Sequence, residues 1–263
     1  MPYSLTAVFL SGNSTEFLFV RFFPLRFNAI IEIRFLSVRI VFPMKSLSQR
    51  RIRSVNALSK SVSIIACGPT NRLAMLGSLK RIGCKVQQIT SPADIIAAKR
   101  IILYGDGLFP DAIARLNRDG LSDAIVRAIT AGTPILGVNL GMQLLFSGSE
   151  QGGRHTGLAV FADRLVRVSG GTRFPHFGWN TVQSVNGCPL LKGLDMHSFY
   201  FLHDYWALDV TGAHVAGITE FGMDFCSVAH RDNVFGVQFC PEKSGEDGIR
   251  LLSNFMEIPS AKG

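Results

Sequence analysis

The sequence lacks the cysteine and histidine patterns of disulfide-stabilised and metal-binding proteins. Its five cysteines are an odd number and stand far apart, with no Cys-x-x-Cys pair: Cys67, Cys84, Cys188, Cys226 and Cys240. This spacing argues against a disulfide framework and indicates a reducing compartment. The six histidines include no His-Glu-x-x-His or comparable ligand spacing. We therefore expect no metal and no cofactor.

Long uncharged apolar runs are also missing. A membrane-spanning helix needs about 18–20 nearly uncharged residues. Charged residues interrupt the Phe-rich N-terminal part of the chain at Arg21, Arg26, Glu32, Arg34 and Arg39. No membrane span is predicted.

Excess positive charge is confined to the N-terminal segment. The formal net charge is +8, but residues 1–60 hold nine Lys and Arg against two Asp and Glu, whereas residues 61–263 hold 18 against 17. Residues 61–263 therefore lack the excess of basic residues that binds a polyanion, and we expect no nucleic-acid partner.

Residues 1–60 are predicted to form a basic, Phe-rich extension. Their Arg-rich, acid-poor composition fits an organelle transit peptide. The absence of clear periodicity and turn punctuation favours a misassigned start, with Met44 or a nearby residue as the true beginning. We prefer the second interpretation and expect a cytoplasmic protein, while a transit peptide would direct it to an organelle. Peptides from residues 1–43 in the purified native protein would weaken this preference.

From Ser61 the chain alternates short apolar runs with amphipathic stretches, which is typical of a parallel sheet with helices on both faces. We expect strands at 63–66, 85–89, 100–104 and 134–138, and helices at 71–82, 93–98 and, as one long helix, 111–131. Residues 157–238 change to short alternating runs separated by turn residues, which predicts largely antiparallel strands. A strand at 234–239 and a helix at 244–256 follow. The pattern predicts one domain over residues 61–258 with a tail at 259–263.

The segment PILGVNLGMQLL, residues 134–145, predicts a strand that breaks on a tight turn into a helix. In several enzyme classes such a turn holds a nucleophile on a strained backbone. Here the central residue is Asn139, whose amide cannot do the work of a thiolate or hydroxyl. Asn tolerates positive φ better than most residues, so the turn can persist without a nucleophile.

Two distant segments, GVNLGMQ at 137–143 and GVQFCPEKSG at 236–245, resemble the nucleophile elbow and the catalytic His-x-Glu strand end of class I glutamine amidotransferases. Within that superfamily the resemblance is strongest to the glutaminase subunits of imidazole glycerol phosphate synthase, and it covers nearly all of residues 62–257. PHFGWN at 175–180 and FYFLH at 199–203 add to it. The resemblance implies a flavodoxin-like three-layer α/β fold with a mostly parallel central sheet and a β-rich second half.

In that family, which serves histidine biosynthesis, an elbow Cys hydrolyses L-glutamine after activation by a His that a Glu orients. Ammonia then passes to a partner cyclase barrel. The resemblance places Asn139 at the nucleophile position, Cys240 at the base position and Glu242 at the orienting position. Only the orienting residue is retained.

The same resemblance assigns substrate binding to Gly105, Gly107 and Gln143. It assigns contact with the cyclase to Asn71, Trp179 and Asn180. The turn that binds the oxyanion in the family reads Tyr104-Gly105-Asp106-Gly107 here. A carboxylate therefore stands beside the place where negative charge develops, which opposes catalysis.

These substitutions predict that glutaminase activity is lost and that the chain acts as a non-catalytic partner of the cyclase, or is the product of a decaying gene. The alternative is an active amidotransferase, or another hydrolase, with a rewired site that uses Cys240. His176 and His203 are the only histidines in matched motifs, and neither stands at the base position.

Overall fold

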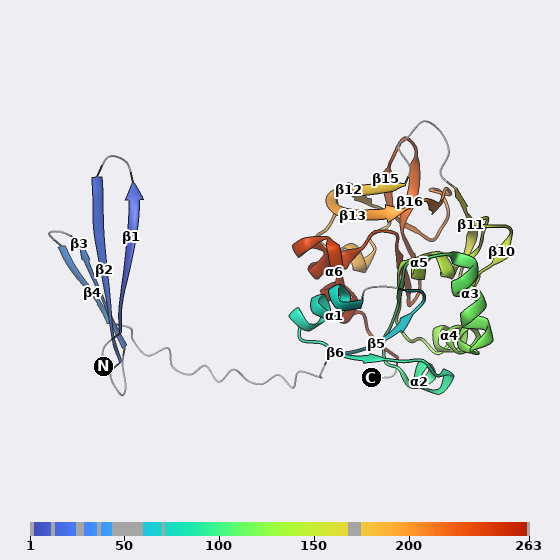
Figure 1. The fold of residues 1–263 in the computed structure, drawn as a ribbon, viewed down its shortest axis with the longest axis horizontal. Coiled ribbons are helices and arrows are strands. Elements are labelled where there is room, and N and C mark those ends of the chain that lie inside the picture. The colour runs from blue at the N-terminus through green and yellow to red at the C-terminus, as the bar shows by residue number, and fades with distance from the viewer. Residues whose placement is uncertain are drawn as a thin grey trace. The chain divides into compact units, whose positions relative to one another are not determined.

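The computed structural model describes residues 60–69, 72–167 and 175–261 in full and, between Tyr3 and Pro43, the backbone of four strands (Figure 1). The chain divides into two compact units, Met1–Ala57 and Leu58–Gly263. In the first unit β1 (Tyr3–Ser11), β2 (Ser14–Pro24), β3 (Ala29–Phe35) and β4 (Val38–Pro43) pair antiparallel in chain order. The sequence pattern did not predict these strands.

The second unit alternates strands and helices in its first half. Its elements there are β5 (Ser61–Ala66), α1 (Arg72–Arg81), β6 (Lys85–Gln88), α2 (Pro92–Ala97), β7 (Ile101–Gly105), α3 (Phe109–Arg118), α4 (Leu121–Thr130), β8 (Ile135–Asn139) and α5 (Leu140–Leu145). The second half is mostly strands: β9 (Phe146–Ser149), β10 (His155–Thr156), β11 (Phe161–Arg167), β12 (His176–Ser184), β13 (His197–His203), β14 (Tyr205–Ala207), β15 (Val215–Glu220), β16 (Asp224–Arg231) and β17 (Val234–Val237). Two 3-10 turns, η1 (Pro189–Leu191) and η2 (Pro241–Lys243), and the helix α6 (Gly245–Glu257) complete it.

A mixed sheet organises this unit. Strands β6, β5, β7, β8 and β17 lie side by side in that order, each parallel to its neighbours, and β16 continues the sheet antiparallel to β17. Because parallel neighbours need crossover connections, helices cover both faces. Helices α1 and α6 lie on one side, and α3 and α4 on the other (Figure 1). The predicted flavodoxin-like three-layer α/β fold is thus confirmed, with antiparallel pairs such as β12–β13 in its second half.

Strand β5 illustrates why this sheet is buried on both faces. Successive side chains of a strand point to opposite sides of the sheet. Ile65 packs in the core shared with α3 and α4, whereas Ile64 packs in the core shared with α1 and α6. An uninterrupted apolar run is therefore the pattern that this central strand requires.

The single long helix expected over residues 111–131 is wrong. Helix α3 ends at Arg118, and α4 begins at Leu121. Gly120 between them has a φ of 68°, a left-handed conformation that glycine adopts without steric cost and that ends a helix. The amphipathic pattern runs through this break because both helices bury the same face against the sheet.

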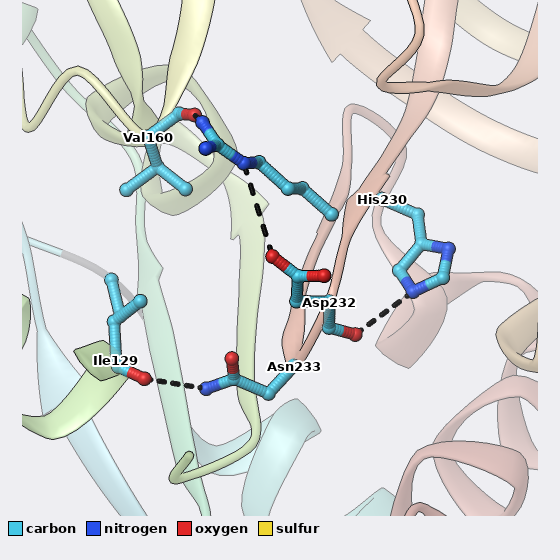
Figure 2. A network of polar contacts seen from close by, with 6 residues as sticks. Ile129, Val160, His230, Asp232 and Asn233 are labelled. Carbon is cyan, nitrogen blue, oxygen red and sulfur yellow. Dashed lines mark hydrogen bonds and ion pairs between the residues drawn. The ribbon is translucent and has the colours of Figure 1, made fainter. Parts of the chain in front are cut away.

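The turn between β16 and β17 fixes the start of β17 (Figure 2). Asn233 donates from Nδ2 to the Ile129 carbonyl over 3.1 Å, and Arg231 donates to the Val160 carbonyl over 3.0 Å. His230 donates from Nε2 to the Asp232 carbonyl over 3.0 Å. These bonds anchor the turn to α4 and to the residue before β11, and β17 then pairs parallel with β8 from Val234 onward.

Candidate functional site

The elbow lies at the carboxyl end of β8, where Asn139 is the last strand residue and α5 follows at once. Asn139 has φ 52° and ψ −113°, so the expected positive φ is present. The glycines on either side are required by space. A Cβ on Gly141 would stand 2.0 Å from the Leu103 carbonyl oxygen, and one on Gly137 would stand 2.6 Å from that of Gly141. The sequence therefore keeps the strained turn of a nucleophile elbow.

The Asn139 amide is fully engaged inside the protein. Its Nδ2 donates to the Leu202 carbonyl over 3.1 Å and lies 3.7 Å from the Cys240 sulfur. Its Oδ1 accepts a hydrogen bond from Gln238 Nε2 over 3.1 Å. A side-chain amide that is only 8% exposed and is bonded through both its nitrogen and its oxygen holds the turn.

Gln143 extends this amide network. Its Nε2 donates to Gln238 Oε1 over 3.3 Å and to the Tyr205 carbonyl over 3.1 Å. Gln238 thus receives one bond and gives one, and links Gln143 to Asn139. A buried polar network in which each amide has partners is rigid and costly to disturb.

Cys240 lies against the elbow, with 3% of its surface exposed. Burial, reinforced by the neighbouring Glu242 carboxylate, raises the pKa of the Cys240 thiol to about 12. The thiol is therefore protonated at neutral pH, whereas nucleophilic cysteines need a lowered pKa.

Glu242, the predicted orienting residue, is bonded to a tyrosine. Its Oε1 accepts a hydrogen bond from the Tyr104 hydroxyl over 3.1 Å, while Oε2 has no hydrogen-bond partner in the described part of the chain. Burial raises the pKa of the Glu242 carboxyl above its ordinary value, and the Tyr104 bond partly opposes this. The predicted orienting carboxyl is thus bonded to a phenol.

The predicted oxyanion turn stands beside the elbow. Gly105 pairs with Asn139 across β7 and β8. A Cβ on Gly105 would stand 2.8 Å from the Gly68 backbone nitrogen, so this close approach requires glycine. Asn139 opens into a cavity of about 290 Å³ that is also lined by Asp106, Gly107, Leu140, Gln143, Gln151, Pro175, Leu202, His203 and Asp204. The predicted substrate residues Gly107 and Gln143 therefore share this cavity with two carboxylates.

The two matched histidines are bonded to each other, and His203 also lines the cavity at Asn139. His203 Nδ1 lies 3.1 Å from the Tyr205 carbonyl, which can only accept, so Nδ1 carries the hydrogen. His203 Nε2 then accepts from His176 Nδ1 over 3.0 Å. Burial lowers the pKa of His203 to about 3 and that of His176 to about 4. Both rings are neutral and provide no free base at the elbow.

The predicted contact residues differ in exposure. Trp179 is 59% exposed and stands edge-on to Tyr200, as does the 66% exposed Phe177. The Asn180 amide is used internally, because its Nδ2 donates to the Glu220 carbonyl over 2.8 Å and lies 3.3 Å from His176 Nε2. Asn71 lies outside the described residues. Trp179 and Phe177 form what we call the aromatic face, on the strand that follows cavity residue Pro175.

Sequence reasoning missed the roles of Gln238 and Tyr104. The signal for Gln238 was its position two residues before Cys240, since alternate residues of an extended segment share a side. The Tyr104 hydroxyl contacts Glu242 only through tertiary packing, so the local sequence around either residue does not predict this hydrogen bond. Within the fully described ranges, no group of three His, Cys, Asp or Glu residues is arranged to hold a metal ion, and no helix is long and apolar enough to cross a membrane.

Comparisons with known proteins agree with this geometry. The glutamine amidotransferase class-I family matches residues 64–258. PurLQS from Thermotoga maritima has the same fold, with a TM-score of 0.60 at 17% identity over 74% of this chain and 97% of that one. The chain therefore belongs to the class I glutamine amidotransferase family.

Within the family the chain is HisH-like. It is 40% identical over 195 residues to the imidazole glycerol phosphate synthase subunit HisH of Desulfitobacterium hafniense, covering 74% of this chain and 92% of the relative. The HisH subunit of Moorella thermoacetica is also 40% identical, over 200 residues that cover 76% and 95% of the two chains.

Proposed function

We propose that this HisH-like chain has lost glutamine hydrolysis and acts as a non-catalytic partner of a cyclase barrel subunit. The observation that carries the proposal is the amide at the elbow. Asn139 occupies the nucleophile position, and its side chain is bonded to Leu202 and Gln238 rather than left free.

Each step of the family reaction lacks its group. An amide is not a nucleophile, and the Cys240 thiol at the base position, whose pKa is about 12, cannot take a proton at neutral pH. Asp106 adds negative charge to the cavity in which the oxyanion would form. Members of a catalytic triad act as a unit, and losing one already removes most of the rate.

A role in docking is supported by the aromatic face. Exposed aromatic side chains are enriched in protein interfaces because they bury much area at a small entropic cost. Trp179 and Phe177 are supported from behind by Tyr200, and they lie on the strand that begins at the cavity. The names of the relatives describe them as subunits of a synthase. We place the cyclase contact of this chain at the aromatic face.

A glutaminase assay of the full chain, alone and with the cyclase subunit of a HisH relative, tests the loss of chemistry. We expect no glutamine turnover above background in either case. Turnover that Cys240→Ala abolishes would overturn the proposal in favour of a rewired hydrolase.

Restoring the site tests whether the scaffold survives. Asn139→Cys alone is expected to stay inactive because the base is missing. The double variant Asn139→Cys, Cys240→His is expected to regain activity, and adding Asp106→Val is expected to raise it further by removing the carboxylate. Equal activity of the single and double variants would contradict the assigned roles.

Co-purification with the cyclase subunit tests docking. Trp179→Ala is expected to weaken the complex at least about tenfold, as for a central interface aromatic. Val126→Ala serves as the matched control, because Val126 is a comparably exposed apolar residue on α4. If no complex forms at micromolar concentration, or if both variants weaken it equally, docking through the aromatic face is wrong.

A further inference from the structure

A second cavity, of about 260 Å³, lies at the carboxyl ends of β5 and β6 beside α3. It shares no lining residue with the cavity at Asn139. Its polar lining comes from Arg72, Gln88, Thr90, Arg115 and Asp119. Four of these five side chains can donate hydrogen bonds, and two carry a permanent positive charge.

Both guanidinium groups of this cavity are held by neutral acceptors. Arg72 Nη1 donates to Gln88 Oε1 over 2.6 Å, and Arg115 Nη2 donates to the Ala66 carbonyl. Neither acceptor cancels a charge, yet each fixes the direction of a flexible side chain. Arg72 and Arg115 are thus oriented in advance while most of their N–H donors stay available.

The one carboxylate in the lining is paired elsewhere. Asp119 Oδ1 accepts from Arg118 Nε over 3.2 Å. Among the fully described residues, neither Arg72 nor Arg115 lies within ion-pair distance of a carboxylate. The positive charge of Arg115 also reaches the interior, where it partly offsets the burial that raises the pKa of Cys67. The cavity therefore has an excess of positive charge.

The place of this cavity in the sheet favours a ligand. It lies outside the carboxyl ends of β5 and β6, and the carboxyl ends of the strands form the edge at which open α/β sheets bind ligands. Helix α1 also begins there, with no acidic residue in its first turn to oppose an anion.

We propose that this cavity binds a phosphate group, either as inorganic phosphate or as a small phosphomonoester. One arginine satisfies a carboxylate through two parallel bonds, whereas a tetrahedral phosphate presents more oxygens and accepts from several donors. Arg72 and Arg115 come from different helices, and with Gln88 and Thr90 in the same lining they supply the several donors that a phosphate accepts from. The site is independent of glutamine hydrolysis, because none of its residues belongs to the elbow.

Calorimetric titration of the full chain with sodium phosphate at constant ionic strength tests the proposal, with sodium chloride as the blank. We expect saturable binding. A parallel titration with glycerol phosphate, against glycerol, identifies the source: tighter binding than inorganic phosphate shows that the site takes an ester. Weaker binding shows that it takes the free ion.

Three variants decide whether this cavity is the site. Arg72→Gln and Arg115→Lys are expected to weaken binding at least about tenfold, because each removes charge-assisted bonds. Arg72 is exposed, so Arg72→Gln is not expected to disturb folding. Arg115→Lys keeps the positive charge but loses the planar guanidinium, which can donate two parallel hydrogen bonds. Arg127→Gln is the control, because Arg127 is an exposed arginine on α4 outside the lining of this cavity, and this variant is expected to bind as the parent does. No saturable binding, or equal weakening in all three variants, would overturn the proposal.

Discussion

Replacing Asn139 by alanine and by glycine separates the strain of the elbow from the hydrogen bonds of its side chain. Both variants remove the bonds to Leu202 and Gln238. A buried polar group left without a partner costs about 1–3 kcal/mol. With two such groups and incomplete burial, we expect Asn139→Ala to lower the free energy of unfolding by about 2–4 kcal/mol.

The glycine variant differs because of backbone conformation. A residue with a side chain held at φ 52° and ψ −113° stores about 1–3 kcal/mol of strain. Glycine relieves this strain but gains about 0.5–1 kcal/mol of freedom in the unfolded chain. Asn139→Gly should therefore be more stable than Asn139→Ala by about 1–2 kcal/mol.

Urea unfolding followed by circular dichroism measures both values, with unchanged slopes as the check that the unfolded states are comparable. Equal stability of the two variants would show that the elbow is not strained. If both matched the parent, the amide network would contribute nothing to stability, and the view of Asn139 as a residue that holds the turn would be refuted.

Three further outcomes are expected. First, burial lowers the pKa values of His176 and His203 from 6.5 to about 4 and about 3, so below pH 6.5 the unfolded chain binds more protons than the folded one. The free energy of unfolding should therefore fall between pH 6.5 and pH 3, by up to about 1.4 kcal/mol per pH unit for each ring. Urea unfolding that shows the same stability across this range would contradict the expectation. Second, Gly141→Ala should lower the free energy of unfolding by about 3 kcal/mol or more, because the new Cβ would stand 2.0 Å from a backbone oxygen. Gly77→Ala in α1, where nothing obstructs a Cβ, should leave the stability unchanged or raise it by about 0.5–1 kcal/mol. Similar thermal midpoints for the two variants would count against the packing argument. Third, Tyr104→Phe should destabilise the protein by about 1–3 kcal/mol, because it removes the hydrogen-bond donor to a buried carboxyl. The loss should grow as the pH is raised through the titration of Glu242, since the phenol favours the ionised form, and a loss that is the same at every pH in denaturant titrations would reject that account.

Sequence patterns predict best the strands that are buried on both faces of the sheet, because such a strand carries apolar side chains toward both faces. Strand β5 reads as an uninterrupted apolar run because it packs helices on both faces, and it was placed within two residues. The break between α3 and α4 was missed because Gly120 interrupts the backbone without interrupting the apolar face. The strands β1 to β4 were not foreseen.

The local sequence by itself determined the turn at Asn139 and the amide at its centre. A glycine on each side of Asn139 specifies a tight turn, and an amide at its centre excludes a nucleophile whatever surrounds it. The tertiary structure alone decided which groups bond to Asn139 and Glu242. The partners of Asn139 are Leu202 on β13 and Gln238 just after β17, and the partner of Glu242 is Tyr104 on β7. These three positions are distant in the chain, and only the packed sheet brings their polar groups to Asn139 and Glu242. Hydrogen bonds act over about 3 Å and depend on angle, so partners distant in the chain cannot be chosen from spacing.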